Sequence, residues 1–416
     1  MNREIKFKFD WLLWFLILLP TFYVFGKDLR HIQMNFFQIS VIMMLAVLHV
    51  NRYFGLFLGW AAFQILFFSD APSKTVLLQN IFFAGVLYHF VVKYVVDMKR
   101  YFWVFFGLLA ANVVWCALQA WQLDPIFHQA QMQHQTWFTE YSGFFALPAF
   151  LGNFAAIVLP LCVFLNPFLG LIAIPALLVS KSSFSLIAAG GGLLFFLWFR
   201  KRLVFWVALI VIVLSGSFYI LKFDAPTGQF GRRLNVWGCV LKEGFKKQFF
   251  GHGIGSFGRK YLFIETTPDH KVRMTQNDTE IHLAVLDSAL AFKKQPVIDY
   301  MVGKSTKDVE LPKLKELAQA SGMDFEAWDN CHNSFIQVFF EMGLFGVLIL
   351  FAFIGNMFRR FLASKKDMEL VALMSAFVAI LIISFAHFPF YLARLGGPCI
   401  VLLALLETKL LRQEHE

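Results

Sequence analysis

The chain has 416 residues, of which 58% are hydrophobic and 15% are charged, and phenylalanine alone fills 53 positions. A soluble domain of this length cannot bury so much apolar surface, so the composition excludes an ordinary soluble protein and indicates a membrane protein. The formal net charge of +10 does not indicate nucleic-acid binding, because many of the basic residues flank apolar segments.

The apolar segments predict an all-α polytopic membrane protein with about 12 transmembrane helices. The first segment leads into further ones without a small-residue cleavage site, which indicates an uncleaved transmembrane helix rather than a signal peptide. Each segment is long enough, or nearly so, to cross the hydrocarbon core of a bilayer. The segments cover residues 11–26, 36–50, 53–69, 76–96, 101–122, 144–166, 167–180, 182–199, 203–221, 335–358, 370–387 and 396–411.

The distribution of basic residues predicts the orientation of these helices. With a cytoplasmic N-terminus, the short outer connections hold Lys27, Arg30, Lys74, Lys181 and Arg394. Sixteen basic residues then lie inside, and cytoplasmic segments normally carry such an excess. They are Arg3, Lys6, Lys8, Arg52, Lys93, Lys99, Arg100, Arg200, Lys201, Arg202, Arg359, Arg360, Lys365, Lys366, Lys409 and Arg412.

This orientation divides the chain into three parts. Residues 1–221 form transmembrane helices 1–9, residues 222–334 form one large polar loop, and residues 335–416 form helices 10–12 and a cytoplasmic tail. The large loop lies outside, which is the periplasm in a cell with two membranes. We therefore expect a multi-pass protein of the bacterial inner membrane with both termini in the cytoplasm and its active site in the periplasm.

Two features interrupt the first nine segments. The loop at 123–143 holds His128 and His134 beside several glutamines; we favour a solvated loop over a sugar-binding one. The short segment 167–180 contains Pro175, and three glycines follow at 190–192. Segments interrupted in this way often line a cavity rather than face lipid.

The large loop changes in charge along its length. Its basic half, 222–273, contains the predicted amphipathic helix "RRLNVWGCVLKEGFKKQFF", in which Leu234, Trp237 and Leu241 share a stripe. Its acidic half, 274–334, contains a predicted soluble helix, "LPKLKELAQASG". The loop is thus expected to contain amphipathic helices, of which the first can lie on the membrane surface.

Several cations near the outer face are candidates for binding an anionic substrate. Arg232 and Arg233 suit a phosphate or pyrophosphate group, since a guanidinium can bind it in a bidentate fork; anchoring to anionic headgroups is the alternative. Lys181 is an isolated cation between two spans, where it either binds substrate or extends to the interface. For the alternating glycines of "GHGIGSFGRK" we favour a tight turn over an anion cradle.

The stretch "CHNSFIQVFFEMGLFGVLIL" joins a polar cluster to an apolar helix. The imidazole of His332 can accept a proton from a hydroxyl near neutral pH, and Asn333 can cap the helix that follows. Glu341 lies roughly on the opposite side of that helix from His332, so we expect a structural role for it. Gly343 and Gly346 would allow another helix to approach closely.

The cysteines and histidines do not indicate a metal site. The histidines are not clustered at metal-ligand spacing, and the chain has no C-x-x-C motif. Of the five cysteines, Cys239 and Cys331 fall in the outer loop, where a disulfide can form. A bridge between them is a hypothesis based only on compartment and number.

Two of these stretches resemble the O-antigen ligase and polymerase superfamily. "CHNSFIQVFFEMGLFGVLIL" is similar to its H-N-x-x-(L/I)-x-x-x-x-x-E-x-G-x-x-G signature. "GRRLNVWGCVLKEGFKKQFFGHGIGSF" is similar to its Arg-x-x-x-Trp helix and glycine turn. The architecture resembles the superfamily over about residues 140–400, whereas residues 262–330 have no counterpart that we can cite.

The resemblance implies transfer of a glycan from undecaprenyl pyrophosphate to a sugar hydroxyl of lipid A-core, for lipopolysaccharide biosynthesis. His332 matches the catalytic histidine, as the base or as a group that positions the acceptor. Arg232 or Arg233 matches the pyrophosphate-binding arginine, and Lys181 stands where the family usually has arginine. Arg259 and Arg394 are further substrate-binding candidates, and the motif residues Asn333, Glu341, Gly343 and Gly346 would be structural.

The expected chemistry needs neither metal nor any other cofactor, and direct displacement would invert the anomeric centre. The expected partners are the lipid-linked glycan, lipid A-core and membrane lipids, with no nucleic acid. A polymerase of repeat units or a protein O-oligosaccharyltransferase of the same superfamily is an alternative. A lipid-linked glycan flippase is the alternative of another class, although the two halves of the chain do not resemble each other as transporter repeats do.

Overall fold

A computed structural model of the chain divides into two compact units. It describes residues 52–68, 74–121, 123, 142–145, 147–210, 227–257, 262–265, 272–275, 295–301, 313, 317, 325–326, 331–387, 389 and 393–415. Unit 1 comprises residues 1–55, 79–216 and 352–416, and unit 2 comprises residues 56–78 and 217–351. The helices α3, α4 and α16 each contribute residues to both units.

Most of the described elements are helices. They are α3 (Arg52–Phe67), α4 (Lys74–Tyr94), α5 (Met98–Ala120), η1 (Gly143–Phe145), α7 (Pro148–Leu165), η2 (Pro167–Ile172), α8 (Ala173–Val179), α9 (Ser183–Arg200), α11 (Thr227–Gly244), η3 (Phe245–Lys247), α14 (Gln295–Met301), α16 (Ser334–Ala363), α17 (Met368–Ser384) and α18 (Ala393–His415).

Four of the described helices are long and apolar enough to cross a membrane: α5, α7, α9 and α16. Shorter apolar helices cover Tyr53–Ile65, Pro167–Val179 and Met368–Ser384. These elements coincide with predicted spans, as do α4 and α18. The segments predicted at 11–26 and 36–50 lie outside the described residues, and only the first part of 203–221 lies within them. The protein is thus a largely helical membrane protein, and the number of twelve spans stays a prediction.

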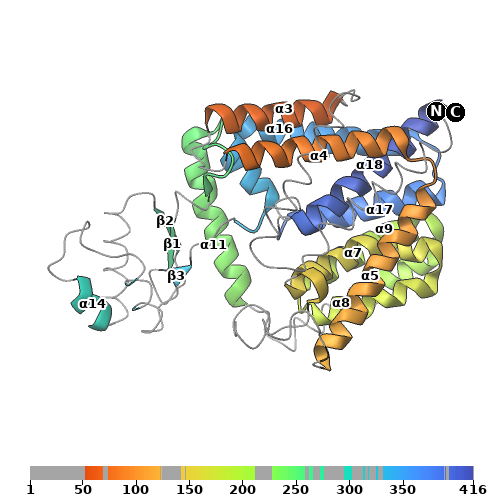
Figure 1. Ribbon diagram of the computed structural model, residues 1–416, viewed down its shortest axis with the longest axis horizontal. Helices are drawn as coiled ribbons and strands as arrows, with labels where there is room; N and C mark the ends of the chain where they lie inside the picture. Colours follow the sequence, from red (N-terminus) through yellow and green to blue (C-terminus); the bar gives the residue numbers. More distant parts are fainter. Residues whose placement is uncertain are drawn as a thin grey trace. The chain divides into compact units, whose positions relative to one another are not determined.

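The core of unit 1 is formed by α7, α9 and α17, which pack against one another (Figure 1). A side chain at Gly191 would meet Ile382, and one at Gly192 would lie 3.0 Å from the Ser375 carbonyl oxygen. The glycine run therefore allows α9 to pack closely against α17. The prediction that these glycines line a cavity is wrong for Gly191 and Gly192, because α17 fills the space beside them.

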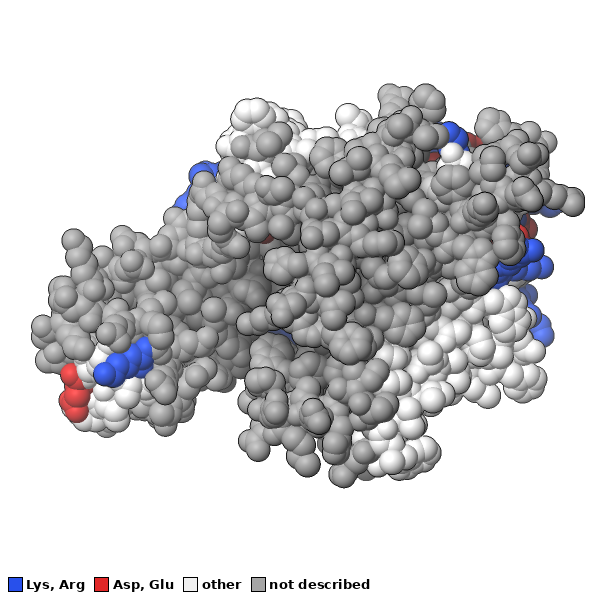
Figure 2. All heavy atoms as spheres, viewed as in Figure 1, with Lys and Arg blue, Asp and Glu red and all other residues white. Residues whose placement is uncertain are grey.

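The outer surface of the apolar helices carries few charges. In Figure 2 the described charged side chains of the face drawn form a few groups, and a continuous described area beside one of them has no Lys, Arg, Asp or Glu. Large exposed hydrophobic residues on these helices include Trp103, Leu178 and Ile187. Such a surface is expected where helices face lipid rather than water.

Two amides of α5 hold the chain where it enters α7. The Asn112 side-chain oxygen accepts a hydrogen bond from the Phe144 N–H (2.8 Å), and the Gln119 side-chain oxygen accepts from the Ser142 and Gly143 N–H groups (3.0 Å each). Gly143 has a positive φ of 58° and lies so close to Asn112 that a side chain would collide with it. The predicted outer loop at 123–143 is fixed at this end, whereas His128 and His134 lie outside the described residues.

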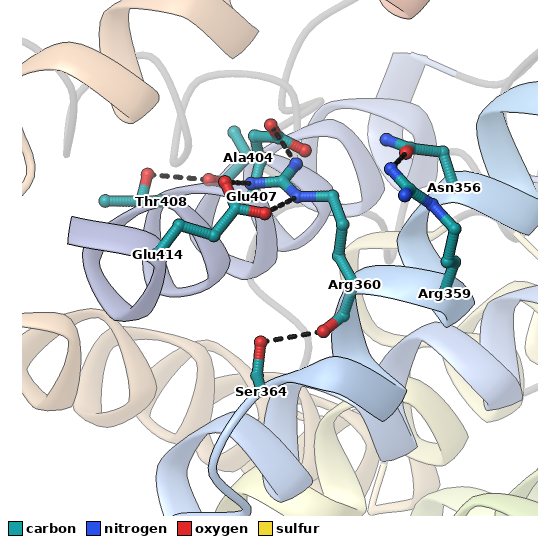
Figure 3. Close-up of polar contacts among 8 residues, drawn as sticks. All are labelled: Asn356, Arg359, Arg360, Ser364, Ala404, Glu407, Thr408 and Glu414. Carbon is teal, nitrogen blue, oxygen red and sulfur yellow. Dashed lines mark hydrogen bonds and ion pairs between the residues drawn. The ribbon is translucent and has the colours of Figure 1, made fainter. Parts of the chain in front are cut away.

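An ion-pair cluster joins the second half of α16 to α18 within unit 1 (Figure 3). Arg360 bonds to Glu407 (2.5 Å) and, through two nitrogens, to Glu414 (2.7 and 3.1 Å). The side chains of Arg360 and Glu407 are only 9% and 2% exposed. Buried charges are stable only when paired and hydrogen-bonded, so this cluster fixes α18 against α16.

Further polar contacts surround that cluster. Lys409 of α18 pairs with Asp367 (2.9 Å) and Glu369 (2.6 Å), and Asp367 also caps α17 by accepting from the Leu370 N–H. Arg412 donates to the backbone carbonyls of Val95 and Val96, which follow α4. Two of the basic residues counted for the orientation, Arg360 and Lys409, are therefore neutralised by acidic partners.

Unit 2 contains α11, α14 and a small antiparallel sheet, so the prediction of an all-α fold is incomplete. The strands are β1 (Leu262–Glu265), β2 (Val272–Thr275) and β3 (Phe325–Glu326), in the order β2-β1-β3. Ile264 pairs with Arg273 of β2 and with Phe325 of β3, and β2 contacts α11. The expected amphipathic helix is present as α11, whereas most of the predicted helix "LPKLKELAQASG" lies outside the described residues.

Candidate active site

α11 places Arg233 and Trp237 on one face. Residues four apart on a helix lie on the same side, one turn apart. The Trp237 indole N–H donates to the backbone carbonyl of Cys331 over 2.8 Å. Trp237 also packs against a buried cluster to which Val236, Val240 and Cys331 belong. The arginine one turn before Trp237 is therefore held on the side of α11 that meets the Cys331–His332 turn.

His332 lies in a turn with a left-handed backbone. Its φ is +54°, and among the described non-glycine residues only His332 and Lys181 (φ +49°) have a positive φ. This region costs a residue with a Cβ atom about 1–2 kcal/mol, and such conformations are concentrated at functional sites. Both of these residues were predicted from the sequence as site residues.

The residues flanking His332 fix the turn. The Asn333 side-chain oxygen accepts hydrogen bonds from the Phe335 and Ile336 N–H groups (3.0 and 3.1 Å), which makes Asn333 the N-cap of α16. On the other side, the Cys331 N–H donates to the Gln337 side-chain oxygen over 3.0 Å. The direction in which the chain enters α16 is thus set by side chains on both sides of His332.

Burial and a nearby cation keep His332 neutral. Burial lowers the pKa of the His332 imidazole most, the positive charge of Arg233 lowers it further, and the resulting pKa is about 4. Burial also lowers the pKa of the Arg233 guanidinium, which nevertheless stays charged near neutral pH because its ordinary value is so high. The site therefore combines a neutral imidazole, which can accept a proton, with a permanent cation that can bind an anion.

Glu341 takes part in a buried chain of hydrogen bonds behind the turn. Its carboxylate accepts a hydrogen bond from the Gln337 side-chain N–H over 2.8 Å, and both residues are 1% exposed. Gln337 in turn bonds to the Cys331 N–H. Glu341 thus reaches the His332 turn through Gln337, on the same helix.

α16 is interrupted at Gly343, which has φ +68° and ψ −170°. The residues Gln248–Gly253, here called the glycine turn, pack their backbone into this break. A side chain at Gly251 would lie 2.5 Å from the Glu341 carbonyl oxygen, and one at Gly343 would lie 2.3 Å from the Phe249 carbonyl oxygen. Two backbones can approach so closely only where neither carries a side chain.

Backbone hydrogen bonds join the glycine turn to both sides of the break. His252 N–H donates to the Phe340 carbonyl (2.8 Å) and Gly253 N–H to the Glu341 carbonyl (2.9 Å), while Leu344 N–H donates to the Gln248 carbonyl (2.7 Å). These bonds satisfy groups that an unbroken helix would pair internally. The glycine turn thus ties α11 to α16 within unit 2. The segment that approaches Gly343 closely is this turn, whereas a side chain at Gly346 would meet Met342 of the same helix.

His252 and Trp60 strengthen this junction. The His252 ring stacks on Phe340 with centroids 4.5 Å apart, and its Nε2 lies 3.1 Å from the Glu243 carbonyl oxygen of α11. The Trp60 indole N–H of α3 donates to the Met342 carbonyl over 3.1 Å, beside the break. Neither residue was predicted from the sequence.

Neither Cys239 nor Cys331 forms a disulfide, so the hypothesis of a bridge between them does not hold. The two residues belong to the same apolar cluster, but the Cys331 thiol donates instead to the Asn333 carbonyl over 3.1 Å. Burial raises the pKa of both thiols, that of Cys331 to about 12, so neither is a reactive thiolate at neutral pH.

The structure places Arg233 and His332 in the same unit, where the charge of Arg233 acts on the His332 imidazole. Lys181 is exposed and follows α8 in unit 1. The side chains of Arg232, in α11, and Arg394, in α18, lie outside the description, as does the whole of Arg259.

Sequence reasoning missed the roles of Trp237 and Gln337. Trp237 was assigned to an apolar stripe, although its indole N–H is bonded to the His332 turn. A signal was present, because Trp237 lies four residues after Arg233 and not after Arg232, which fits the Arg-x-x-x-Trp spacing with Arg233 alone. Gln337 is an amide within an otherwise apolar segment four residues before Glu341, a spacing that allows a side-chain pair on a helix.

A comparison with protein families gives a match within the second and final thirds of the chain. Residues 167–351 match the family model described as O-Antigen ligase. The matched segment includes Lys181, Arg233 and His332 together with the whole of α11 and the break in α16. No curated protein is significantly similar to the chain.

Proposed function

We propose that the chain is a membrane glycosyltransferase of the ligase type, on the premise that residues 167–351, which match the O-Antigen ligase family model, act as such a domain. The donor is a glycan linked to undecaprenyl pyrophosphate, and the acceptor is a sugar hydroxyl of lipid A-core on the periplasmic face of the inner membrane. The product belongs to lipopolysaccharide biosynthesis. The apolar helices suit a donor whose polyprenyl chain stays in the bilayer.

The observation that carries this proposal is the position of Arg233, one helical turn before the tryptophan that is hydrogen-bonded to the His332 turn. A cation that acts electrostatically on a neutral, partly buried imidazole provides an anion-binding group and a proton acceptor within one site. Trp237 and the glycine turn hold the elements that carry the two groups. A transporter needs a binding site for the same glycan but no proton acceptor beside the pyrophosphate.

The reaction follows from these two groups. The acceptor hydroxyl attacks the anomeric carbon while its proton passes to the His332 imidazole, and a new glycosidic C–O bond forms. The bond between the anomeric carbon and the pyrophosphate oxygen breaks, and the electron pair leaves with undecaprenyl pyrophosphate. Arg233 neutralises the charge that develops on that leaving group. Attack opposite to the leaving group inverts the anomeric centre, and the step needs neither metal nor any other cofactor.

Other cations are candidates for contacts with the donor. Lys181 supplies a point charge where a fork-shaped guanidinium would bind two oxygens, so its contribution to pyrophosphate binding is smaller than that of an arginine. Arg232, Arg259 and Arg394 are further candidates for substrate contacts. In the predicted orientation all of these residues lie on the periplasmic side, and both termini lie in the cytoplasm.

A transfer assay tests the proposal. Purified protein is mixed with undecaprenyl-pyrophosphate glycan and lipid A-core, with EDTA and without nucleotide. We expect transfer by the wild type, and its loss in His332→Ala and in Arg233→Ala. Transfer that requires an added divalent metal would contradict the metal-independent mechanism.

The other outcomes distinguish the alternatives. Glycan chains that grow on the polyprenyl carrier would identify a polymerase, and transfer to an added pilin-like protein would identify a protein O-oligosaccharyltransferase. If the protein moves lipid-linked glycan across vesicles without transferring it, the flippase replaces the enzyme. Binding of the donor by His332→Ala without transfer would support the assignment of His332 to the chemical step.

A further inference from the structure

Cys331, the residue that precedes His332, is hydrogen-bonded through both of its backbone polar groups. The Cys331 carbonyl accepts from the Trp237 indole at 2.8 Å, and the Cys331 N–H donates to the Gln337 side-chain oxygen at 3.0 Å. The backbone of His332 itself is left-handed, with φ +54°. A conformation of this cost persists only where surrounding contacts fix it. The two bonds to Cys331 are contacts of this kind, and one of them originates in α16 itself.

The orientation of the Gln337 amide decides whether this bond exists. An amide has a donor end and an acceptor end, and the Cys331 N–H can bond only to the oxygen. The Glu341 carboxylate accepts from the Gln337 nitrogen at 2.8 Å, which forces the oxygen to face Cys331. Since Gln337 and Glu341 are both 1% exposed, water does not replace either partner. Glu341 thus selects the amide orientation that holds the turn.

We propose that Gln337 and Glu341 are positioning residues for His332, acting as a hydrogen-bond relay from Glu341 through Gln337 to the Cys331 N–H. This role rests on the proposed function of His332 in glycan transfer. Neither side chain contacts a reacting atom in this role; the relay sets where the imidazole stands relative to Arg233 and the acceptor. The relay explains why an apolar helix contains a carboxylate: Glu341 helps to fix the turn that precedes the helix.

The charge of Glu341 is not what the relay uses. Arg233 and burial lower the pKa of His332, and Glu341 has no part in that shift, although it does raise the pKa of the Cys331 thiol. What Glu341 supplies is an acceptor at a fixed place. An amide oxygen is an acceptor as well, so Glu341→Gln should preserve the relay, whereas Glu341→Ala should release Gln337.

Exchange of the two residues provides the test. In Gln337→Glu two buried carboxylates face each other, so either their charges repel and the donor to Glu341 is lost, or one of them must take up a proton at a free-energy cost. In the double variant Gln337→Glu/Glu341→Gln, the carboxylate at 337 accepts from both the Cys331 N–H and the new amide at 341, so every hydrogen bond of the relay is restored. We expect kcat to fall about tenfold or more in Gln337→Glu and in Glu341→Ala, with little change in the donor KM. Glu341→Gln and the exchange variant should retain kcat within about threefold of the wild type.

Two results would overturn the relay. One is an exchange variant as slow as Gln337→Glu, and the other is a Glu341→Ala protein with the kcat of the wild type. Thermal melting of each variant in detergent distinguishes slow from unfolded protein. The His332 signal in ¹⁵N-histidine NMR, assigned with His332→Ala, should move in Glu341→Ala and stay in Glu341→Gln. This spectrum tests the relay even if the wild type transfers no glycan, in which case the proposed function fails and the relay is judged on its own.

Discussion

Trp237 and Cys331 are joined by a hydrogen bond from the indole N–H to the backbone carbonyl, 2.8 Å long. The two residues belong to elements far apart in the chain, α11 and the turn before α16. Because Arg233 lies one turn before Trp237 and His332 directly follows Cys331, this one bond sets the two candidate catalytic and binding groups relative to each other. The fold of unit 2 is thus built around keeping a cation beside an imidazole.

Removal of this bond should slow transfer more than it destabilises the protein. Trp237→Phe keeps an aromatic ring against the apolar cluster but leaves the Cys331 carbonyl without the indole donor, a loss of about 1 kcal/mol. We expect initial rates of transfer to fall about fivefold to tenfold, with a small decrease in melting temperature. The control is Trp103→Phe in α5, an exposed residue of unit 1, which should leave the rate unchanged. Equal rates in the two variants would contradict the role of Trp237.

The glycine turn offers a matched pair of substitutions. Gly251→Ala places a methyl group 2.5 Å from the backbone of Glu341 at a φ of +73°, so the turn and the helix break cannot remain in contact. Gly238→Ala, on α11, meets nothing within 4 Å and adds helix propensity. We expect Gly251→Ala to lower the melting temperature and the transfer rate strongly. Gly238→Ala should be neutral or more stable by up to about 1 kcal/mol. Melting curves in detergent and initial rates measure both effects.

The helices of this protein were predictable because their sequences are apolar over the length of a membrane span. The break in α16 was not, although Gly343 was identified as unusual. In the sequence Gly343 lies within a continuous apolar run, and helix–helix packing is the usual reason for a glycine there. The structure shows that Gly343 meets backbone atoms of Phe249 and Gly251, and no local pattern reveals such a distant partner.

Only part of the candidate site was predicted, because the contacts that position its residues leave no local pattern in the sequence. His332 and the arginine doublet stand out as polar residues at the ends of apolar segments, and resemblance to a family identified them further. The hydrogen bonds that position them join backbone groups to side chains such as Gln337. The spacing of Gln337 and Glu341 allows a side-chain pair, but it does not reveal the bond from the Cys331 N–H to Gln337. The small sheet of unit 2 was missed because strands of two to four residues carry too little alternation to be recognised.

Arg360 is expected to matter for stability and not for catalysis. Arg360→Met removes the partner of the buried Glu407 and leaves an uncompensated carboxylate, which typically costs about 3–5 kcal/mol. Arg359, which lies beside it in the same helix, is exposed and bonds only to Asn356 among the contacts drawn in Figure 3. Arg359→Met should therefore change the melting temperature little.

The double variant Arg360→Met/Glu407→Leu tests whether the uncompensated charge of Glu407 or a loss of packing destabilises Arg360→Met. If the uncompensated charge is the cause, this variant should recover much of the stability lost in Arg360→Met. In Arg360→Met, Arg359→Met and the double variant, the transfer rate per folded molecule should equal that of the wild type. A lower rate in the recovered double variant would show that the cluster influences the reaction.

The pH dependence of His332 should depend on Arg233. A nearby cation disfavours the imidazolium, so Arg233→Gln should raise the pKa of His332 from about 4. The pKa should remain below the ordinary value near 6.5, because burial is the larger cause and persists in the variant. Lys242→Gln, further along α11, is the control; Lys242 acts on Cys239 and is not among the described causes of the His332 shift, so the titration of His332 should stay as in the wild type.

Two measurements test the predicted rise in the pKa of His332. ¹⁵N-histidine NMR follows the imidazole directly, and its titration midpoint should move upward only in Arg233→Gln. In the wild type the unfolded chain binds a proton at His332 below about pH 6.5 while the native site does not, so this residue destabilises the protein progressively between about pH 6.5 and pH 4. Arg233→Gln raises the native pKa of His332, which is the lower limit of that pH interval, so His332 destabilises the variant over a narrower pH range. The melting temperature of the variant should therefore fall less steeply with acidification than that of the wild type. A midpoint unchanged by Arg233→Gln would mean that the two side chains do not interact, and the electrostatic support for the proposed function would be lost.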